Sequence, residues 1–345
     1  MVTKGGEVLE TRNTMRAARF ERASGKLTVQ DVPIPQPGPG EVLVRVEAAG
    51  ICGSDVHMIK GEFPPPLEQV TPGHEVAGTI AQVGPEVPPF WQGQTDQRVV
   101  LLGGKSSCMV MGQAYDGGWA EYVVVPHDRL VAAPDNVPFE QAAIIPDAVA
   151  TPWGGIVHRG KLRQGEVVGL WGIGGLGQHA VQIARMNGAG LIIAIDPIEA
   201  ARLRALAAGA HHALDPGAVD VREEVMRLTD NKGLNLAVEL SGSNIALDQA
   251  VSCLGFFGRA VVIGMSTEPI RLTEPSVMFG FNNHSLLGFD GGEPSDVEML
   301  VCYAASGKLD LSRSVSHVLP LEEVVRGVEM LSKKIDNPAR IVVKP

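Results

Sequence analysis

The hydrophobic pattern of the first part of the chain predicts short strands. Apolar and polar residues alternate in the segments RAARF, KLTVQDV and EVLVRVEAAG, and the last of these follows the turn-rich stretch PIPQPGPG. Alternation is typical of strands with one buried face, and proline and glycine mark turns between them. Further short apolar runs occur in AGTIAQVG, QRVVLL and AEYVVVP. We therefore expect roughly the first 140 residues to be rich in strands.

The pattern of apolar and polar residues changes near residue 139. The stretch PFEQAAIIPDAVATPWGGI predicts a helical region interrupted by proline. Beyond it, continuous apolar runs alternate with helical segments: GEVVGLW, LIIAID, LAVELSG and GRAVVIGM are the runs, and GQHAVQIARMNG, EAARLRALAAG and ALDQAVSCL are the helices. This alternation predicts an α/β fold with a doubly wound parallel sheet. Two amphipathic helices, SDVEMLVCYAASGKLD and PLEEVVRGVEMLSKKI, and a strand, ARIVVKP, complete the chain.

Length and composition narrow the possible functions. A chain of 345 residues predicts two domains. A net charge of −10, without a run of lysine and arginine, argues against a nucleic-acid partner. The sequence contains no run of 18 apolar residues, so it predicts no membrane span. Residues 1–14 lack the apolar segment of a secretory signal. We expect those residues to be a loose extension or a misassigned start.

The four cysteines are Cys52, Cys108, Cys253 and Cys302, and they are far apart in the sequence. Such spacing does not indicate a disulfide framework, so we expect a reducing, cytoplasmic compartment.

A glycine-rich turn indicates a dinucleotide site. The strand GEVVGLW runs into a turn whose residues are Gly172, Ile173, Gly174, Gly175, Leu176 and Gly177, and a helix follows. Glycines here allow a tight turn and let backbone N–H groups approach a pyrophosphate at a helix N-terminus. Asp196, at the end of the next strand, can accept hydrogen bonds from ribose hydroxyls and would repel a 2′-phosphate. The pattern favours NAD over NADP, and a glycine-rich turn without a nucleotide is the alternative.

A second cluster of chemically competent residues occurs in GICGSDVH, which contains Cys52. His74 and Glu75 follow in TPGHEVAG, and Asp147 lies in IIPDAVAT. Cysteine, histidine and carboxylate side chains are all zinc ligands, and three of them with an open fourth position make a catalytic site. From the residues alone, a buried thiol, a turn histidine and a helix cap explain them equally well.

The motifs taken together resemble a known family. GICGSDVHMIKGEF, PGHEVAGTI, DGGWAEYVVVP, DAVATPWGGI and GIGGLG occur in the order found in the zinc-dependent medium-chain alcohol dehydrogenases, from about Met15 to Pro345. The resemblance implies a strand-rich GroES-like catalytic domain over 15–149 and a Rossmann NAD-binding domain over 150–287. It also implies a return to the catalytic domain over 288–345.

The resemblance assigns roles at the candidate metal site. It implies that Cys52, His74 and Asp147 bind one catalytic zinc, with Asp147 standing where other members have a second cysteine. Glu75 matches an acid that approaches the zinc during ligand exchange, and Asp55 matches an acid that orients His74. Ser54 and His57 match a relay that carries the alcohol proton to solvent. The two glycines of GICGSDVH are expected to keep one tight turn around the metal.

The resemblance also assigns cofactor contacts. Thr151 matches a residue beside the nicotinamide, and Arg340 matches an arginine that contacts the pyrophosphate. Ser241, Gly264 and Met265, which follow the strands LAVELSG and GRAVVIGM, are further cofactor-binding candidates.

Two departures from the family are informative. Many members hold a structural zinc with four cysteines, but the corresponding stretch GGKSSCMVMGQAYDGG contains only Cys108, so we expect no structural zinc. Trp119 stands where the family often has phenylalanine in the substrate pocket. With Phe63 and Met265 nearby, it would narrow an apolar pocket suited to a hydrophobic alcohol or ketone.

The leading interpretation is an NAD- and zinc-dependent dehydrogenase that acts on a small alcohol, aldehyde or ketone. A polyol or amino-alcohol dehydrogenase, a zinc-free reductase of activated C=C bonds and a nucleotide-binding protein without activity are the alternatives. The family resemblance implies a homodimer or homotetramer assembled through the nucleotide domain.

Overall fold

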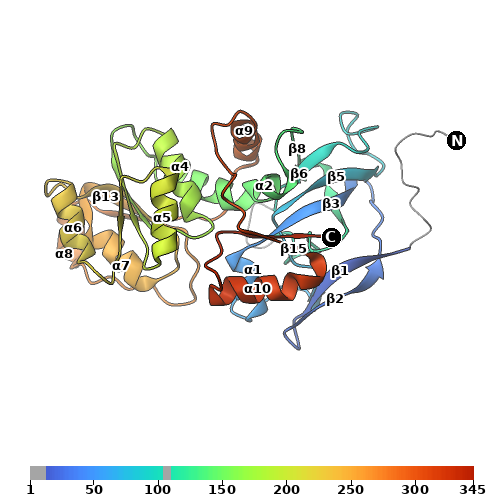
Figure 1. The fold of residues 1–345 in the computed structure, drawn as a ribbon, viewed down its shortest axis with the longest axis horizontal. Coiled ribbons are helices and arrows are strands. Elements are labelled where there is room, and N and C mark those ends of the chain that lie inside the picture. The colour runs from blue at the N-terminus through green and yellow to red at the C-terminus, as the bar shows by residue number, and fades with distance from the viewer. Residues whose placement is uncertain (1–12, 104–109) are drawn as a thin grey trace.

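The computed structural model describes residues 13–103 and 110–345, and these residues form two lobes joined by a helical connection (Figure 1). One lobe contains a parallel sheet with its helices. The other contains the N-terminal strands and the end of the chain. Within the described residues, no helix is long and apolar enough to cross a bilayer.

The N-terminal lobe is built on antiparallel strands that the C-terminus completes. In the part of the chain described, its main sheet has the order β15-β16-β3-β5-β6-β8, and β7 also pairs with β3. The strands are β3 (Glu41–Ile51), β5 (Val76–Val83), β6 (Arg98–Leu101), β7 (Tyr122–Pro126), β8 (Leu130–Ala132), β15 (His317–Pro320) and β16 (Ile341–Lys344). A smaller sheet contains β1 (Thr14–Glu21), β2 (Lys26–Pro33) and β4 (Gln69–Val70).

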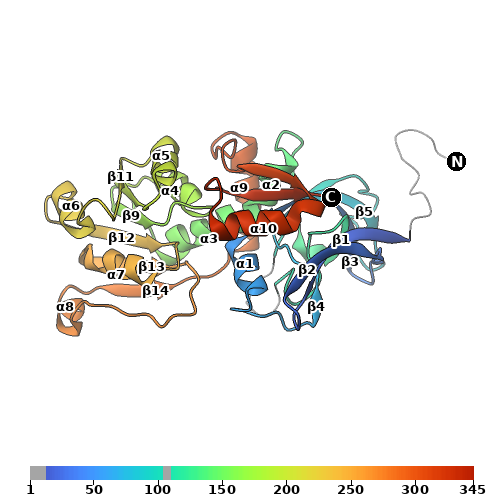
Figure 2. The same ribbon diagram turned by 60° about the horizontal axis from the view of Figure 1, so that its bottom comes forward.

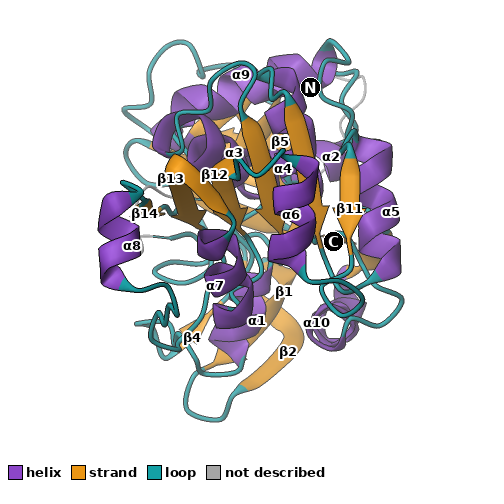
Figure 3. Ribbon diagram, turned by 90° about the vertical axis from the view of Figure 1, so that its left-hand side faces the viewer, coloured by secondary structure: helices purple, strands orange, loops and turns teal. Residues whose placement is uncertain are grey.

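The other lobe is a parallel sheet of order β11-β10-β9-β12-β13-β14 with helices on both faces (Figure 3). Its strands are β9 (Val167–Trp171), β10 (Leu191–Ile195), β11 (His212–Leu214), β12 (Leu234–Glu239), β13 (Leu254–Val262) and β14 (Ser285–Gly288). Its helices are α4 (Gly177–Met186), α5 (Glu199–Ala208), α6 (Val221–Leu228), α7 (Asn244–Ser252) and α8 (Ser276–Phe281). The strand order reverses between β9 and β12, and ligands of doubly wound sheets bind at such a point.

Four consecutive helical segments connect the lobes. They are α2 (Phe139–Ala143), the wide turns Ile145–Val149 and Gly154–Arg159, and α3 (Ala150–Trp153) between those turns. Pro146 and Pro152 lie within them, and proline cannot donate the backbone hydrogen bond of a regular helix. The predicted proline-interrupted helix is therefore confirmed.

The remaining helices lie beside this connection and the N-terminal lobe. They are α1 (Gly53–Ile59), α9 (Pro294–Ala305) and α10 (Val324–Lys333), with short 3-10 turns at His127–Arg129 and Leu321–Glu323. Figure 2 shows α1 and α10 side by side, in agreement with their contacts. One hydrophobic core runs through both lobes, because Val100 of β6, Ile144, Val168 of β9 and Leu300 of α9 belong to the same cluster.

The predicted α/β fold class is confirmed, and one local expectation is wrong. The segment after Cys52 is the helix α1 and not a tight turn. A side chain at Gly53 would meet nothing within 4 Å, whereas a Cβ at Gly50 would lie 1.9 Å from Oε2 of Glu75. Gly50 is therefore required to make room for a buried carboxylate. The sequence pattern also missed β11, α6, α8 and β14, which are short or exposed.

Candidate active site

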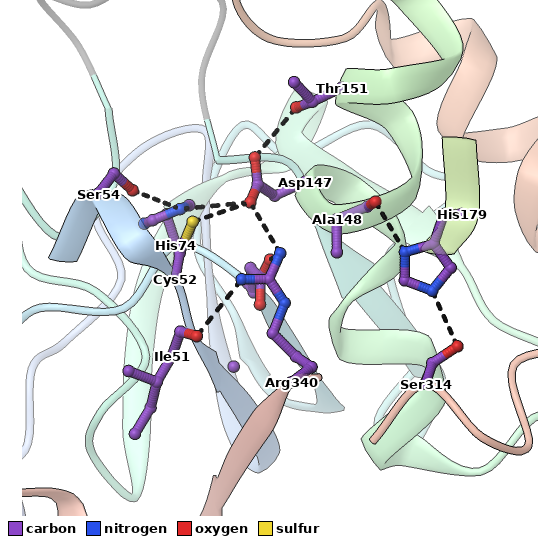
Figure 4. A network of polar contacts seen from close by, with 12 residues as sticks. Ile51, Cys52, Ser54, His74, Asp147, Ala148, Thr151, His179, Ser314 and Arg340 are labelled. Carbon is purple, nitrogen blue, oxygen red and sulfur yellow. Dashed lines mark hydrogen bonds and ion pairs between the residues drawn. The ribbon is translucent and has the colours of Figure 1, made fainter. Parts of the chain in front are cut away.

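Three potential metal ligands from distant segments converge at the junction of the lobes (Figure 4). Cys52 follows β3, His74 precedes β5, and Asp147 lies in the first wide turn of the connection. Their ligand atoms all lie within 4.8 Å of one another, the only such group of three or more that the described residues contain. Oδ2 of Asp147 lies 3.2 Å from Sγ of Cys52 and 3.8 Å from Nε2 of His74. A thiolate, an imidazole and a carboxylate at this spacing fit a zinc ion.

Neighbouring side chains hold these three groups in place. Asp55 is fully buried, and its Oδ2 accepts a hydrogen bond of 2.9 Å from the backbone N–H of Cys52. Its Oδ1 lies 3.3 Å from Nδ1 of His74, which leaves the Nε2 atom of that ring facing Asp147. The Thr151 hydroxyl donates a 3.0 Å hydrogen bond to Oδ1 of Asp147. Such contacts orient ligating rings and carboxylates.

The charges of this cluster shift its protonation. Burial disfavours a charged imidazole, but the carboxylates of Asp55 and Asp147 outweigh it and raise the pKa of His74 well above its usual value. Burial would raise the pKa of Asp147, but hydrogen bonding to His74 and the charge of Arg340 hold it below its usual range. The carboxylates thus favour a positive charge beside His74, and a bound metal cation would supply that charge.

A buried ion pair within the N-terminal lobe lies between the cluster and the glycine-rich turn. Nη2 of Arg340 lies 2.9 Å from Oε1 of Glu75 and 3.5 Å from Oδ2 of Asp147, and Nη1 donates to the carbonyl of Ile51 at 3.4 Å (Figure 4). Burial raises the pKa of Glu75, and the positive charge of Arg340 only partly offsets this effect. At Arg340 burial acts in the opposite direction, but the negative charges of Glu75 and its neighbours outweigh it and raise the pKa of Arg340. Nε of Arg340 has no hydrogen-bond partner in the described structure. A Cβ at Gly175 would lie 3.3 Å from that Nε, so this atom faces the glycine-rich turn.

The glycine-rich turn has the steric features of a phosphate-binding loop. Gly172 has a φ of +87°, and a Cβ at Gly177 would lie 2.1 Å from the carbonyl oxygen of Gly172, so both positions need glycine. A Cβ at Gly174 would meet nothing within 4 Å. The space in front of Gly174 is thus open for a ligand that approaches the backbone closely. The open turn and the unpartnered Nε of Arg340 fit a bound dinucleotide phosphate.

Asp196 is tied to the same turn. Its Oδ2 accepts a hydrogen bond of 2.7 Å from the N–H of Ile173, and its Oδ1 accepts one of 2.8 Å from the N–H of Ile198. The carboxylate is mostly buried and lines the cleft at the end of β10.

A single cavity of about 890 Å³ joins the candidate metal ligands to the glycine-rich turn. The sequence-predicted residues that line it are Cys52, His74, Asp147, Ser54, His57, Thr151, Gly172, Gly174, Gly175, Leu176, Gly177, Asp196, Ser241, Gly264, Met265 and Arg340. Asp55 and Glu75 are buried outside its wall. The cavity therefore brings the candidate metal ligands and the glycine-rich turn together around one space that is open to ligands.

The two candidate proton carriers occupy different depths of the cavity. Oγ of Ser54 lies 3.4 Å from Nε2 of His74, beside the candidate metal ligands. His57 lies on the same helix at the edge of the cavity, where its Nδ1 is 2.6 Å from Oε2 of Glu62 and its side chain is 31% exposed. Both residues are half-buried; Ser54 lies beside the candidate metal ligands, and His57 lies further along the helix, where it can exchange protons with water.

The expectation that Trp119, Phe63 and Met265 narrow an apolar substrate pocket is wrong for two of these three residues. Trp119 is fully buried beneath Gly73 and donates a 3.0 Å hydrogen bond to the carbonyl of Gly50. Phe63 is exposed and stacks edge-on against His57. Neither lines the cavity, whereas Met265 does. The Trp119 ring is needed to fill the lobe's core behind His74, which the sequence alone could not distinguish from a pocket wall.

Other residues line the cavity on the side of the N-terminal lobe: Leu102, Gly103, Val110, Gln113 and Arg129. This wall adjoins the candidate metal site, since a Cβ at Gly103 would lie 3.1 Å from the carbonyl oxygen of His74. The wall mixes apolar with polar groups. The expectation about Cys108 lies outside the described residues.

Sequence reasoning missed His179. Its Nδ1 donates to the carbonyl of Ala148 at 2.9 Å, and its Nε2 accepts from Oγ of Ser314 at 2.8 Å (Figure 4). Burial, with the nearby charge of Arg340, lowers the pKa of His179 to about 4. The neutral ring fixes the backbone next to Asp147. A histidine two residues after a glycine turn gives no signal of this role.

Comparison with known proteins identifies the family. A model described as the alcohol dehydrogenase GroES-like domain matches residues 38–135, and a model described as zinc-binding dehydrogenase matches residues 175–305. An NAD-dependent alcohol dehydrogenase of Sulfurisphaera tokodaii is 30% identical over 339 residues, which cover 92% of this chain and 96% of the relative. The chain belongs to the zinc-dependent medium-chain alcohol dehydrogenase family.

Further relatives agree in sequence and fold. An alcohol dehydrogenase of Cupriavidus necator is 29% identical over 96% of this chain and 99% of its own length. The solved structure of alcohol dehydrogenase TADH from Thermus sp. ATN1 is 28% identical, with a TM-score of 0.85 over 96% of this chain and 99% of that one. Membership of the family makes the chain an oxidoreductase, and the family resemblance drawn from the sequence motifs is confirmed.

Proposed function

We propose that this protein is an NAD- and zinc-dependent dehydrogenase that transfers a hydride between an alcohol and the nicotinamide. The observation that carries the proposal is the convergence of Cys52, His74 and Asp147 in the cavity that also contains the glycine-rich turn. In this proposal the three residues hold one catalytic zinc. A zinc ion bound there would act as a Lewis acid toward the alcohol oxygen.

The chain's own residues would position the reactants and move the proton. Gly174 and Arg340 would bind the pyrophosphate, and Asp196 would accept hydrogen bonds from the adenosine ribose. Thr151, Ser241, Gly264 and Met265 are proposed to enclose the nicotinamide, because they line the part of the cleft beyond the turn. Ser54 would take the alcohol proton, and His57 would pass it to water or to Glu62, which is 2.6 Å away.

Asp55 and Glu75 would act from behind the cavity wall. Asp55 would keep Nε2 of His74 directed at the metal by holding its Nδ1 side. Glu75 pairs with Arg340 and interacts electrostatically with Asp147 and Cys52. It would therefore be close enough to leave Arg340 and approach the zinc while a ligand is exchanged.

The polar wall favours a second candidate substrate class. Gln113 and Arg129 line the cavity in the lobe that contributes His74, and they could bind a second hydroxyl or another acceptor group of a polar alcohol. A polyol or amino-alcohol substrate is therefore retained beside a simple hydrophobic alcohol or ketone.

The test is a spectrophotometric assay of NADH formation with zinc-loaded protein and a panel of primary, secondary, polyhydric and amino alcohols. We expect turnover with at least one class, faster with NAD than with NADP. Absence of turnover with every alcohol and carbonyl, in protein that binds NADH, would contradict the proposal.

Several proposals about organisation accompany this function. We propose domains over 15–149 and 150–287 with a return segment over 288–345, one zinc per subunit without a structural zinc, and a homodimer or homotetramer. Light scattering that gives the mass of a single chain would refute the oligomer.

A further inference from the structure

An arginine from the parallel-sheet lobe lies beside Asp196 without a carboxylate of its own. Arg204 of α5 donates through Nη2 to the carbonyl of Ile173 at 3.5 Å and through Nη1 to the carbonyl of Asn337 at 3.3 Å. Both contacts are long, and its Nε is buried with no hydrogen-bond partner among the described residues. Asp196 accepts the N–H of the same Ile173. The carboxylate and the guanidinium therefore contact the backbone of the same residue of the glycine-rich turn, one at its N–H and the other at its carbonyl.

A lysine from the other lobe reaches the same corner. Lys334 follows the last residue of α10 and has the left-handed backbone conformation, with a φ of +55° that residues other than glycine rarely adopt. It lines the cavity together with Asn337 and Arg340, on the segment that leads from α10 into β16. In the described structure no carboxylate lies within ion-pair distance of its ammonium group, in contrast to the adjacent Lys333, which pairs with Glu329 at 2.6 Å.

The corner carries more positive than negative charge. Burial lowers the pKa of Lys334, and the negative charge of Asp196 opposes this shift. Repulsion from three other cations lowers the pKa of Lys334 further: Arg340, Arg204 and Lys60. Burial likewise lowers the pKa of Arg204, and Asp196 is the carboxylate that opposes it. Arg340 differs from these two cations because it already lies within ion-pair distance of Glu75 and Asp147. Among the described residues, Asp196 is thus the carboxylate whose charge opposes burial at both Arg204 and Lys334, and neither cation forms an ion pair there.

We propose that Arg204 and Lys334 bind a phosphate group of the cofactor at the adenosine end of the cleft. Charge-assisted hydrogen bonds from arginine and lysine to phosphate oxygens would relieve the repulsion and satisfy the free Nε of Arg204. The inference rests on the proposed dinucleotide binding. The phosphate can come from the cofactor's diphosphate or from the 2′-phosphate of NADP, which an arginine near the ribose accommodates.

The experiment measures dissociation constants of NADH and NADPH by fluorescence titration of the full chain at low ionic strength. The variants are Arg204→Gln and Lys334→Gln, with Arg204→Lys as a variant that keeps the charge. The matched controls are Lys333→Gln, beside Lys334, and Arg227→Gln, which removes an exposed arginine of α6 that pairs with Glu224 and does not line the cavity. Circular dichroism of each variant shows that it is folded.

We expect each Gln variant to weaken binding of at least one cofactor about tenfold, the effect of one charge-assisted hydrogen bond. Arg204→Lys should retain part of the affinity, and the controls should change it less than about twofold. Equal losses for NADH and NADPH would support a diphosphate contact. A loss confined to NADPH would support a 2′-phosphate contact.

Two results would overturn the inference in distinguishable ways. If both Gln variants bind NADH and NADPH as tightly as the controls do, Arg204 and Lys334 do not bind phosphate, and the proposed dehydrogenase function is unaffected. If the unaltered protein binds neither cofactor, both this inference and the proposed function are wrong.

Discussion

The two ends of the cleft are built by different means. At the metal end, side chains from three distant segments, Cys52, His74 and Asp147, supply the chemistry, and buried neighbours such as Asp55 hold them. At the nucleotide end, a continuous stretch of backbone supplies most of the groups that would contact the ligand. The open space at Gly174 is as important there as any side chain.

This difference has consequences for substitution. A site made from side chains is lost when one ligating atom is removed, while the lobe around it stays folded. A site made from backbone is lost when an added side-chain atom fills the space of the turn. The same atom can clash with the surrounding backbone and destabilise the fold. The predictions below separate these two cases.

The largest effect is expected at the metal end. His74→Ala removes one proposed zinc ligand and should lower kcat/KM by about 10³-fold or more, equivalent to about 4 kcal/mol of transition-state stabilisation. Cys302→Ser, which changes an exposed free cysteine, is the control and should leave activity unchanged. Comparable activity of His74→Ala and Cys302→Ser in steady-state NADH formation would show that His74 is not a ligand.

His179 joins the two ends, and its effect depends on pH. Its pKa is about 4 in the folded protein against 6.5 normally, so between these values the unfolded chain binds a proton that the folded one does not. Stability is therefore lost as pH falls from about 6.5 toward 4, by about 3 kcal/mol in total. His179→Gln should lack this component. Urea unfolding of both proteins at pH 7.5 and 4.5 measures it, and identical pH dependence would contradict the assignment.

A pair of glycine substitutions tests the nucleotide end. Gly177→Ala would place a Cβ 2.1 Å from the carbonyl oxygen of Gly172 and should destabilise the fold by about 1–3 kcal/mol. Gly174→Ala meets no neighbour, so it should leave the unfolding free energy nearly unchanged and weaken NADH binding instead. Chemical denaturation and NADH titration of the two variants measure both quantities. Unaltered NADH affinity in Gly174→Ala would exclude a close approach of phosphate to this turn.

The smallest effect is expected from the support of the metal ligands. Asp55→Asn keeps the shape of the side chain but weakens its hold on His74, and should reduce zinc affinity about 10- to 100-fold. Competition with a chelator measures the affinity. If Asp55→Asn retains zinc as tightly as the unaltered protein, the orientation of His74 is set by packing alone.

The same contrast explains how much could be predicted from the sequence. The glycine-rich turn and Asp196 are local features, and the strand and helix around them follow from hydrophobic periodicity, so the parallel sheet and the position of the candidate cofactor turn were predictable. The metal cluster was not, because spacing along the chain does not show that Cys52 and Asp147 meet; only the family resemblance placed them together.

The remaining differences arise from burial and charge. Whether Trp119 fills a core or lines a pocket depends on how the loop after β6 packs, and no pattern in the sequence encodes that. Arg204 and Lys334 were missed for a related reason. They come from different lobes, and only the folded structure brings both of them to the cavity that Asp196 lines.

The most direct test of the account is the zinc content of the protein purified without chelators. Elemental analysis should give one zinc per chain, and Cys52→Ala should lose it while the control Cys302→Ser retains it. A protein that contains no zinc, and takes up none on reconstitution, would contradict a metal site at Cys52, His74 and Asp147.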